Sequence, residues 1–166
     1  NTVLYTGNNT DDTDITGLNF QPDFTWIKAR TTAGSNQNHV VFDSVRGVEE
    51  TLWPNGTWAE DDTGNHVSSF NSNGVTIGTS GNLNVNNDTY AMWAWKETAA
   101  AGFDIVSYTG DGNSNRDISH NLGVAPEFYI IKARNEAGHD WNCWHSALAS
   151  GQYGALNSSN GFASDS

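Results

Sequence analysis

The sequence predicts an all-β protein: an antiparallel β-sandwich or jelly roll, present as a tandem repeat whose second copy is incomplete. Short runs rich in β-branched and aromatic residues alternate with turn-forming Asn and Gly, which is typical of sandwiches and barrels. Several of these runs occur twice, about 103 residues apart. A period of that length corresponds to a whole domain, not to the short repeat of a solenoid.

The repeat is clearest in the pattern Phe-x-x-Ile-Lys-Ala-Arg, which spans Phe24–Arg30 and returns at Phe128–Arg134. Further matched blocks are 5–7 with 108–110, 14–16 with 117–119, and 41–44 with 143–146. The order of the blocks is the same in both copies, so the two segments derive from one unit.

These blocks divide the chain into a first sandwich (1–97), a linker (98–102) and a partial second copy (103–166). The second copy has no counterpart of the block 70–96. Either the parent protein continues with further repeats, which we favour, or the second copy is a shortened version that completes the first domain.

The best-defined strand is Phe24–Ala29, which follows Pro22, a tolerated residue at the start of a strand. Alternation places Trp26 on one face and Ile27 on the other. Both faces therefore carry apolar groups, which is typical of a strand buried between two layers. The same holds for 128–133.

The other strands are expected at short apolar runs bounded by turn residues. They are Val3–Tyr5, His39–Phe42, Thr51–Trp53, His66–Phe70, Val75–Ile77, Leu83–Val85, Tyr90–Trp95, Phe103–Tyr108 and Asn142–His145. Because rings alternate with small residues in Tyr90–Trp95, we expect Trp93 and Trp95 to lie in the core with Trp26. Only Ser44–Thr51 is a candidate for a short helical turn.

The net charge argues against nucleic acid and anionic membranes as partners. Nineteen acidic against seven basic residues give a net charge of −12, a field that repels nucleic acid and anionic membranes. No apolar run approaches the roughly 20 residues that span a bilayer. The single Cys143 forms no intrachain disulfide, and we expect it to be a small buried apolar residue. The polar composition suits an extracellular or virion protein.

The sequence resembles a repeated domain of tail-fibre-like and other structural proteins of marine bacteriophages. The resemblance rests on residues 17–28, 42–47, 69–78 and 90–96, covers nearly all of 3–96, and recurs at 103–151. It implies a concanavalin-A-like sandwich in a virion or adhesion protein, without a catalytic role. The partners it implies are other copies of the chain or neighbouring virion or fibre subunits.

The residues predict no enzyme. A convergent nucleophile, acid or base is required for catalysis, and no Gly-x-Ser-x-Gly, His-Glu-x-x-His or phosphate-binding Gly-rich loop occurs. The carboxylates at Glu49–Glu50 and Glu60–Asp62 are interpreted as a solvated face, although paired carboxylates serve glycoside hydrolysis in some enzymes. The five histidines are interpreted as surface or turn residues.

One loop is a candidate Ca²⁺ site. Asp111, Asn113, Asn115 and Asp117 place oxygen-bearing side chains at every second position, as a hard cation requires. The loop is not an EF-hand, because Arg116 stands where a calcium loop needs Gly. The alternative is an ordinary hairpin loop of Asn, Asp and Gly.

The candidate ligand-binding residues are Trp53, Trp58, Trp26 and Arg30. Flat Trp rings stack on sugar faces, and an Arg beside Trp26 on the same strand face suits a sugar or an anion. The alternatives stay open: the loop 53–58 folds over its own rings, and the Lys-Ala-Arg cations neutralise carboxylates such as Asp23 or Asp43.

The resulting hypothesis is a non-catalytic structural or adhesive module of a virion appendage, such as a tail fibre, or of an extracellular surface fibre. Its loops are expected to face a host or a cell-surface glycan, and its tandem copies to raise the effective concentration of weak sites. The alternative hypothesis is a lectin-like carbohydrate-binding domain attached to a glycan-active enzyme. No cofactor is expected other than a candidate Ca²⁺.

Overall fold

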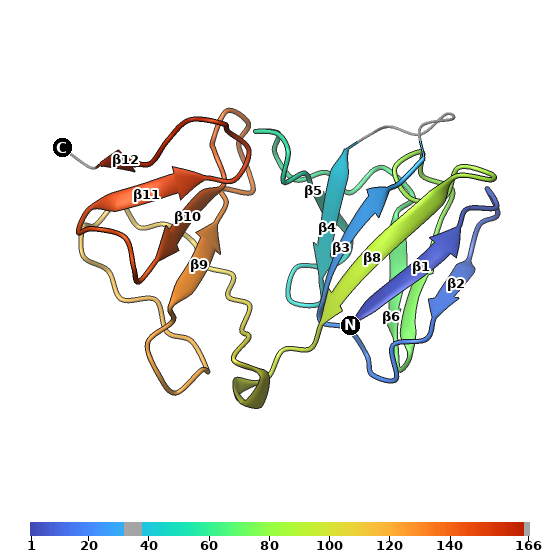
Figure 1. The fold of residues 1–166 in the computed structure, drawn as a ribbon, viewed down its shortest axis with the longest axis horizontal. Coiled ribbons are helices and arrows are strands. Elements are labelled where there is room, and N and C mark those ends of the chain that lie inside the picture. Colours follow the sequence, from blue (N-terminus) through green and yellow to red (C-terminus); the bar gives the residue numbers. More distant parts are fainter. Residues whose placement is uncertain (32–37, 165–166) are drawn as a thin grey trace.

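The computed structural model describes residues 1–31 and 38–164, and this part of the chain is all-β, as the sequence predicts. Twelve strands and one 3₁₀ turn (Ala99–Ala101) make up its regular structure. All of its strand pairs are antiparallel. Figure 1 shows two bodies, a sandwich and a smaller C-terminal sheet, joined by the segment that carries the 3₁₀ turn.

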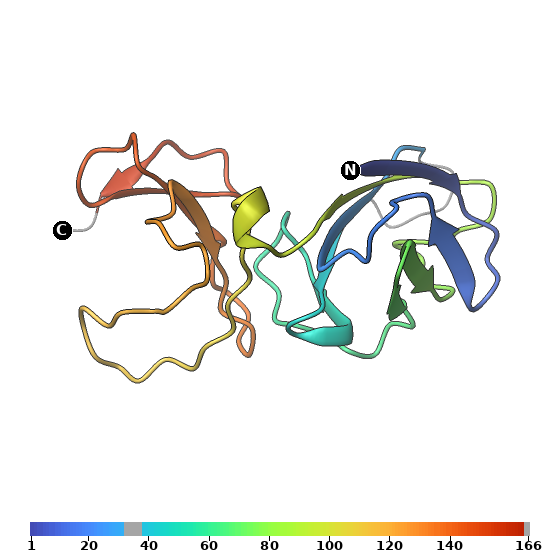
Figure 2. The ribbon, with the colours of Figure 1, turned by 90° about the horizontal axis from the view of Figure 1, so that it is seen from below.

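The sandwich is formed by a five-stranded and a three-stranded sheet packed face to face (Figures 1 and 2). In spatial order, the first sheet contains β1 (Thr2–Thr6), β8 (Thr89–Trp95), β3 (Phe24–Ala29), β4 (His39–Asp43) and β5 (Gly47–Leu52). The second contains β2 (Thr13–Thr16), β7 (Gly74–Ile77) and β6 (Val67–Asn71). The C-terminal sheet contains β12 (Ala163–Ser164), β11 (Gln152–Ala155), β10 (Asn142–His145) and β9 (Phe128–Ile131).

The core of the sandwich lies between its two sheets. Alternate residues of the central strands point inward, so Ile27, Phe42 and Met92 are all 0% exposed. Val75 and Ile77 meet them from the second sheet and are also 0% exposed. The apolar alternation of these strands therefore selects both the strand conformation and the face that is buried.

The repeated segments form hairpins with the same register. Phe24 stands opposite Asp43 in β3–β4, and Phe128 stands opposite His145 in β9–β10. The hydrogen bond that closes each hairpin also recurs. The Ser44 N–H donates to the Asp23 carbonyl at 2.9 Å, and the Ser146 N–H donates to the Glu127 carbonyl at 2.8 Å. The backbone of the second hairpin therefore repeats that of the first.

Two of the expected strands are absent from the described structure. Leu83–Val85 is a turn whose carbonyl at Leu83 accepts the Tyr5 hydroxyl at 2.9 Å, and Leu83 itself is fully buried. Phe103–Tyr108 is extended chain with only a bridge from Phe103 to Thr98. Each run has the apolar composition of a strand, but no neighbouring strand offers it a ladder of hydrogen bonds.

The expectation that Trp93 and Trp95 lie in the core is wrong. Their side chains are 38% and 39% exposed, on the outer face of the five-stranded sheet. Trp26 stands opposite Trp93 on this face and is partly exposed. The inward positions of β8 are taken by Met92 and Ala94 instead.

Candidate functional site

The sandwich and the C-terminal sheet meet at a junction formed by two loops. One loop follows β5 and the other connects β9 to β10. Trp141, only 6% exposed, packs on Val41 and Leu52 of the five-stranded sheet. Its indole N–H donates to the Trp53 carbonyl at 3.0 Å. The Gly138 N–H donates to the Thr57 carbonyl at 2.8 Å, so backbone as well as side chains hold the loops together.

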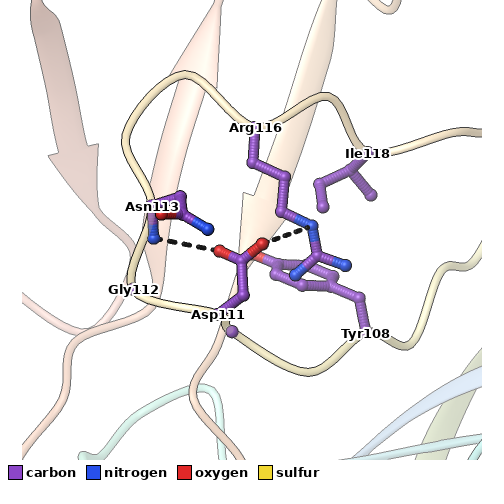
Figure 3. Close-up of a pocket in the computed structure, with 7 residues that line it drawn as sticks. Tyr108, Asp111, Gly112, Asn113, Arg116 and Ile118 are labelled. Carbon is purple, nitrogen blue, oxygen red and sulfur yellow. Dashed lines mark hydrogen bonds and ion pairs between the residues drawn. The ribbon is translucent and has the colours of Figure 1, made fainter.

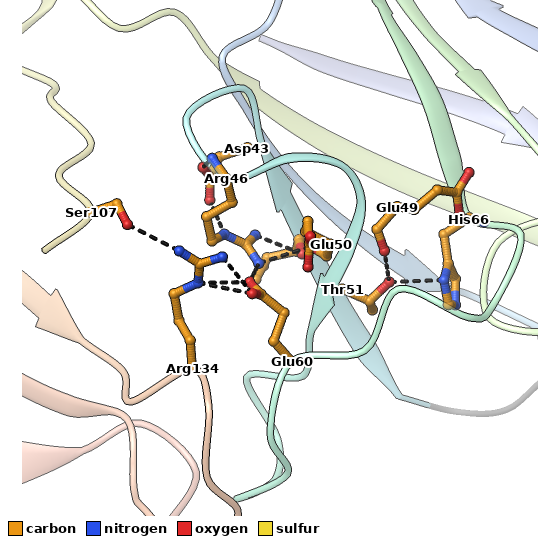
Figure 4. Close-up of polar contacts among 10 residues, drawn as sticks. Asp43, Arg46, Glu49, Glu50, Thr51, Glu60, His66, Ser107 and Arg134 are labelled. Carbon is orange, nitrogen blue, oxygen red and sulfur yellow. Dashed lines mark hydrogen bonds and ion pairs between the residues drawn. The ribbon is translucent and has the colours of Figure 1, made fainter. Parts of the chain in front are cut away.

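Glu60 is the polar centre of this junction, because its carboxylate binds one arginine from each body (Figure 4). Arg46 of the sandwich donates from Nη1 to Oε1 at 2.8 Å. Arg134, next to the C-terminal sheet, donates from Nε to Oε1 at 3.0 Å and from Nη2 to Oε2 at 2.5 Å. A planar guanidinium that engages both carboxylate oxygens fixes orientation as well as charge.

The Arg46 side of this site is built into the turn between β4 and β5. Arg46 is ion-paired with Asp43, and its side chain is only 6% exposed. Its remaining donors reach the Glu50 carbonyl at 2.8 Å and the Val41 carbonyl at 3.2 Å. Each of the three guanidinium nitrogens therefore has an acceptor, as a buried charge requires.

Burial and neighbouring charge shift the pKa of Glu60 in opposite directions and that of Glu50 in the same direction. Burial alone raises the pKa of Glu60, but hydrogen bonds from Arg134 and Arg46 outweigh it and hold the pKa below its ordinary value. Burial and the negative charge of Glu60 raise the pKa of the neighbouring Glu50. Glu60 therefore remains an anion between the two arginines at neutral pH.

The two copies of Lys-Ala-Arg differ in what their arginines contact. Arg134 binds Glu60, whereas the equivalent Arg30 is exposed and forms no ion pair with a residue that the structure describes. Arg134 thus neutralises a carboxylate, as one interpretation of the motif predicts, but neither arginine is ion-paired with Asp23 or Asp43. Asp43 pairs with Arg46, while Asp23 accepts the Ser44 hydroxyl at 3.2 Å and the Glu97 N–H at 2.8 Å.

A buried polar group in the sandwich contradicts the surface assignment of one histidine. His66 is only 3% exposed, and its Nδ1 lies 2.8 Å from the Thr51 hydroxyl (Figure 4). The Thr51 hydroxyl donates its one proton to the Glu49 carbonyl at 3.0 Å, so it accepts a hydrogen bond from the His66 ring. Burial lowers the pKa of His66, against the opposing charges of Glu49 and Asp61. The residue types resemble a nucleophile and a base, but Thr51 is 0% exposed, so no substrate reaches its hydroxyl.

The four candidate ligand-binding residues come from two segments: Trp26 and Arg30 from β3 and the residue after it, and Trp53 and Trp58 from the loop after β5. Trp58 is 50% exposed and packs edge-on against Trp53, with ring centroids 6.0 Å apart. Its ring also covers Gly56, so the loop folds over its own rings. Trp26 donates from Nε1 to His39 Nδ1 at 2.9 Å, and Arg30 lies four residues further along the strand direction.

The candidate calcium loop is arranged around Arg116 (Figure 3). Asp111 accepts the Asn113 N–H at 3.0 Å and lies 3.6 Å from Arg116. Arg116 also lies over the Tyr108 ring, 5.9 Å from its centroid. Its guanidinium is thus paired with the Asp111 carboxylate that the Ca²⁺ hypothesis assigns to the cation. Within residues 1–31 and 38–164, no three His, Cys, Asp or Glu side chains form a metal-binding group.

A family described as a domain of unknown function, DUF7483, matches residues 1–166. The chain belongs to this family. The match runs through both bodies, so the DUF7483 unit includes the junction as well as the sandwich. No curated protein and no solved structure matches the chain.

In the described part of this DUF7483 chain, no helix is long and apolar enough to cross a membrane. The junction is not predicted from the sequence. The prediction of a solvated face for Glu60–Asp62 is wrong for Glu60, whose side chain is only 12% exposed. Its two arginine partners, Arg46 and Arg134, lie 14 and 74 residues away along the chain. Only the recurrence of Lys-Ala-Arg gave a signal for Arg134.

Proposed function

We propose that this chain is a non-catalytic structural module of a virion appendage or an extracellular surface fibre, whose successive units dock through the Glu60 junction. The observation that carries the proposal is the position of Arg134. It belongs to the repeated Lys-Ala-Arg motif, and it binds a carboxylate of the other body with two donors. A repeated residue is thereby used for contact between units.

The two sides of the junction come from different surfaces. The sandwich contributes the loop after β5 and the outer face around Val41, and the C-terminal sheet contributes the loop between its first two strands. Contacts of this heterologous kind can be propagated from unit to unit, which suits an elongated fibre. The resemblance of residues 3–96 to repeated domains of bacteriophage fibre proteins favours a virion appendage.

The native location tests this proposal. Antibodies raised against the purified chain would be used to label virions and extracellular material from the source organism for electron microscopy. We expect label along fibres or appendages. Label confined to the cell interior, or turnover of any substrate by the purified chain, would contradict the proposal.

A second candidate is carbohydrate binding, favoured by the exposed rings of the five-stranded sheet. Trp93 and Trp95 are neighbours on one strand face, 38% and 39% exposed, with Trp26 beside them. Flat exposed rings of this kind can stack on sugars. A glycan array would test it with the wild-type chain and with Trp93→Ala and Trp95→Ala, using Trp58→Ala as the control in a different loop. Binding that is lost only in the first two variants supports a lectin-like role, and no binding by the wild-type chain rejects it.

A further inference from the structure

The inner face of the C-terminal sheet lacks the cover that the same hairpin has in the sandwich. Ile27 is 0% exposed beneath the three-stranded sheet, whereas Ile131, at the equivalent place in β9, is 42% exposed. Tyr129, 41% exposed, stacks on Trp144 with ring centroids 5.2 Å apart. These residues and Tyr153 line a depression of about 440 Å³. An apolar face of this kind is a typical docking surface.

The first strand of this hairpin also has an unpaired edge. In the sandwich, β3 pairs with β4 on one side and with β8 on the other. In the C-terminal sheet, β9 pairs with β10 and is the last strand of the sheet. Its free edge presents backbone N–H and C=O groups that can accept a further strand.

Two more segments of the second unit lack the strand structure of their counterparts. Residues 105–109 and 117–119 correspond to β1 and β2 but form no strand (Figure 1). In the sandwich, β1 pairs only with β8, and β2 pairs only with β7. The open face, the free edge and the two unformed strands therefore all lie where the sandwich has β6, β7 and β8 as neighbours.

We propose that the C-terminal sheet is an acceptor for a polypeptide segment with the pattern of β6–β8. A β8-like strand pairs antiparallel with β9, and a β6–β7-like hairpin covers Ile131 and Tyr129. This inference rests on the proposed function, because it takes the C-terminal sheet as a module of the same kind as the sandwich.

The register of the sandwich defines how such a segment fits. Met92 stands opposite Ile27, and Ala94 stands opposite Thr25. Transferred to β9, a Met92-like residue lies beside Ile131, and a small Ala94-like residue lies beside the larger Tyr129. The bound strand thereby satisfies the backbone of β9 and removes apolar surface from water, which are the two contributions that drive strand addition.

The test uses the full chain, extended at its C-terminus by a flexible Gly/Ser linker and a second copy of residues 65–96 as the probe. The linker keeps the probe at high effective concentration. Amide hydrogen exchange of residues 128–131 is compared between the chain and the extended chain. We expect exchange in β9 to slow by about tenfold or more, because edge amides become paired. A matched control carries Asp in place of Met92 and Ala94 in the appended copy only, and we expect no slowing there.

Two variants in β9 of the extended chain distinguish specific docking on the inner face from a slowing of exchange that any appended segment would cause. Ile131→Asp lies on the inner face and should abolish the slowing, whereas Ile130→Asp lies on the outer face of the same strand and should retain it. Because both side chains are at least 38% exposed, neither change should unfold the chain. Unchanged exchange in β9, or equal slowing in both variants, overturns the proposal. So does a dimer of the unextended chain that protects β9, because a second copy is then the occupant. These outcomes leave the location test of the proposed function unaffected.

Discussion

The hairpins β3–β4 and β9–β10 have the same register and very different surroundings. Ile27 and Ile131 occupy the same place in them, yet one is 0% exposed and the other 42%. Both hairpins form, so the register is determined locally by the repeated sequence and its closing hydrogen bond. Burial is determined by the other strands, which cover the hairpin in the sandwich and have no counterpart among the described residues of the C-terminal sheet. The local sequence therefore determines the hairpin, whereas strands from elsewhere in the chain determine whether it is buried.

Truncating the two isoleucines should give the largest difference. Ile27→Ala removes packed methylene groups from a closed core, so we expect the free energy of unfolding of the sandwich to fall by about 2–5 kcal/mol. Ile131→Ala removes atoms from a residue that is already 42% exposed, so we expect a much smaller loss, about 0.5 kcal/mol. Urea unfolding monitored by Trp fluorescence measures both. Equal losses in the two variants would mean that the inner face of the C-terminal sheet is covered in solution.

Neutralising Glu60 should have the next largest effect, because it acts on the junction and on a buried arginine together. Glu60→Gln keeps the shape but leaves Arg46 with Asp43 as its remaining anionic partner. We expect a loss of about 2 kcal/mol, below the range for breaking a fully buried pair because Arg134 is partly exposed. Small-angle scattering should also report a wider distribution of distances between the two bodies. If Glu60→Gln changed neither the scattering profile nor the free energy of unfolding, Glu60 would not be the residue that holds the junction together.

Removing Arg134 or Arg30 should affect the stability of the chain differently, although both arginines belong to the same repeated motif. Arg134→Ala deletes a paired guanidinium at a partly exposed site, with an expected loss of about 1 kcal/mol that shrinks at high salt. Arg30→Ala is the matched control in the same motif, and we expect no measurable change. Chemical denaturation at low and high salt measures both variants. If the two variants behave alike, the repeated motif has no role in contact between units.

The sequence predicts the backbone of this fold better than its surfaces. Phe24–Ala29 and Asn142–His145 are strands with the predicted bounds, because their alternation and turn residues act locally. Phe103–Tyr108 has the same kind of composition but no strand beside it, and composition does not report a missing neighbour.

The exposed tryptophans and the junction could not be predicted for a related reason. Alternation in β8 shows that Trp93 and Trp95 share a face but not which face is covered by a second sheet. Glu60 and Arg134 meet only through tertiary structure, across 74 residues. Local patterns give no signal for such a pair.

The smallest expected effect is the pH dependence of the sandwich, which His66 should dominate near neutrality. Its folded pKa is lowered by burial, so the unfolded chain binds a proton more readily than the folded one. Stability is therefore greatest above the ordinary His pKa of about 6.5 and falls as pH decreases through it. Between pH 7 and pH 6 a single group of this kind contributes at most about 0.7 kcal/mol.

Denaturation at several pH values, with His66→Gln and the exposed His139→Gln as matched variants, tests this assignment. We expect the pH dependence to shrink with the first variant, leaving the contribution of His39, whose pKa burial also lowers. We expect it to persist unchanged with the second variant, whose side chain is 55% exposed. Because His66 lies in the sandwich and the C-terminal sheet has no equivalent buried histidine among its described residues, the effect should report on one body alone. A pH dependence that His66→Gln leaves unchanged would assign it instead to His39 or to carboxylates outside the Thr51–His66 contact.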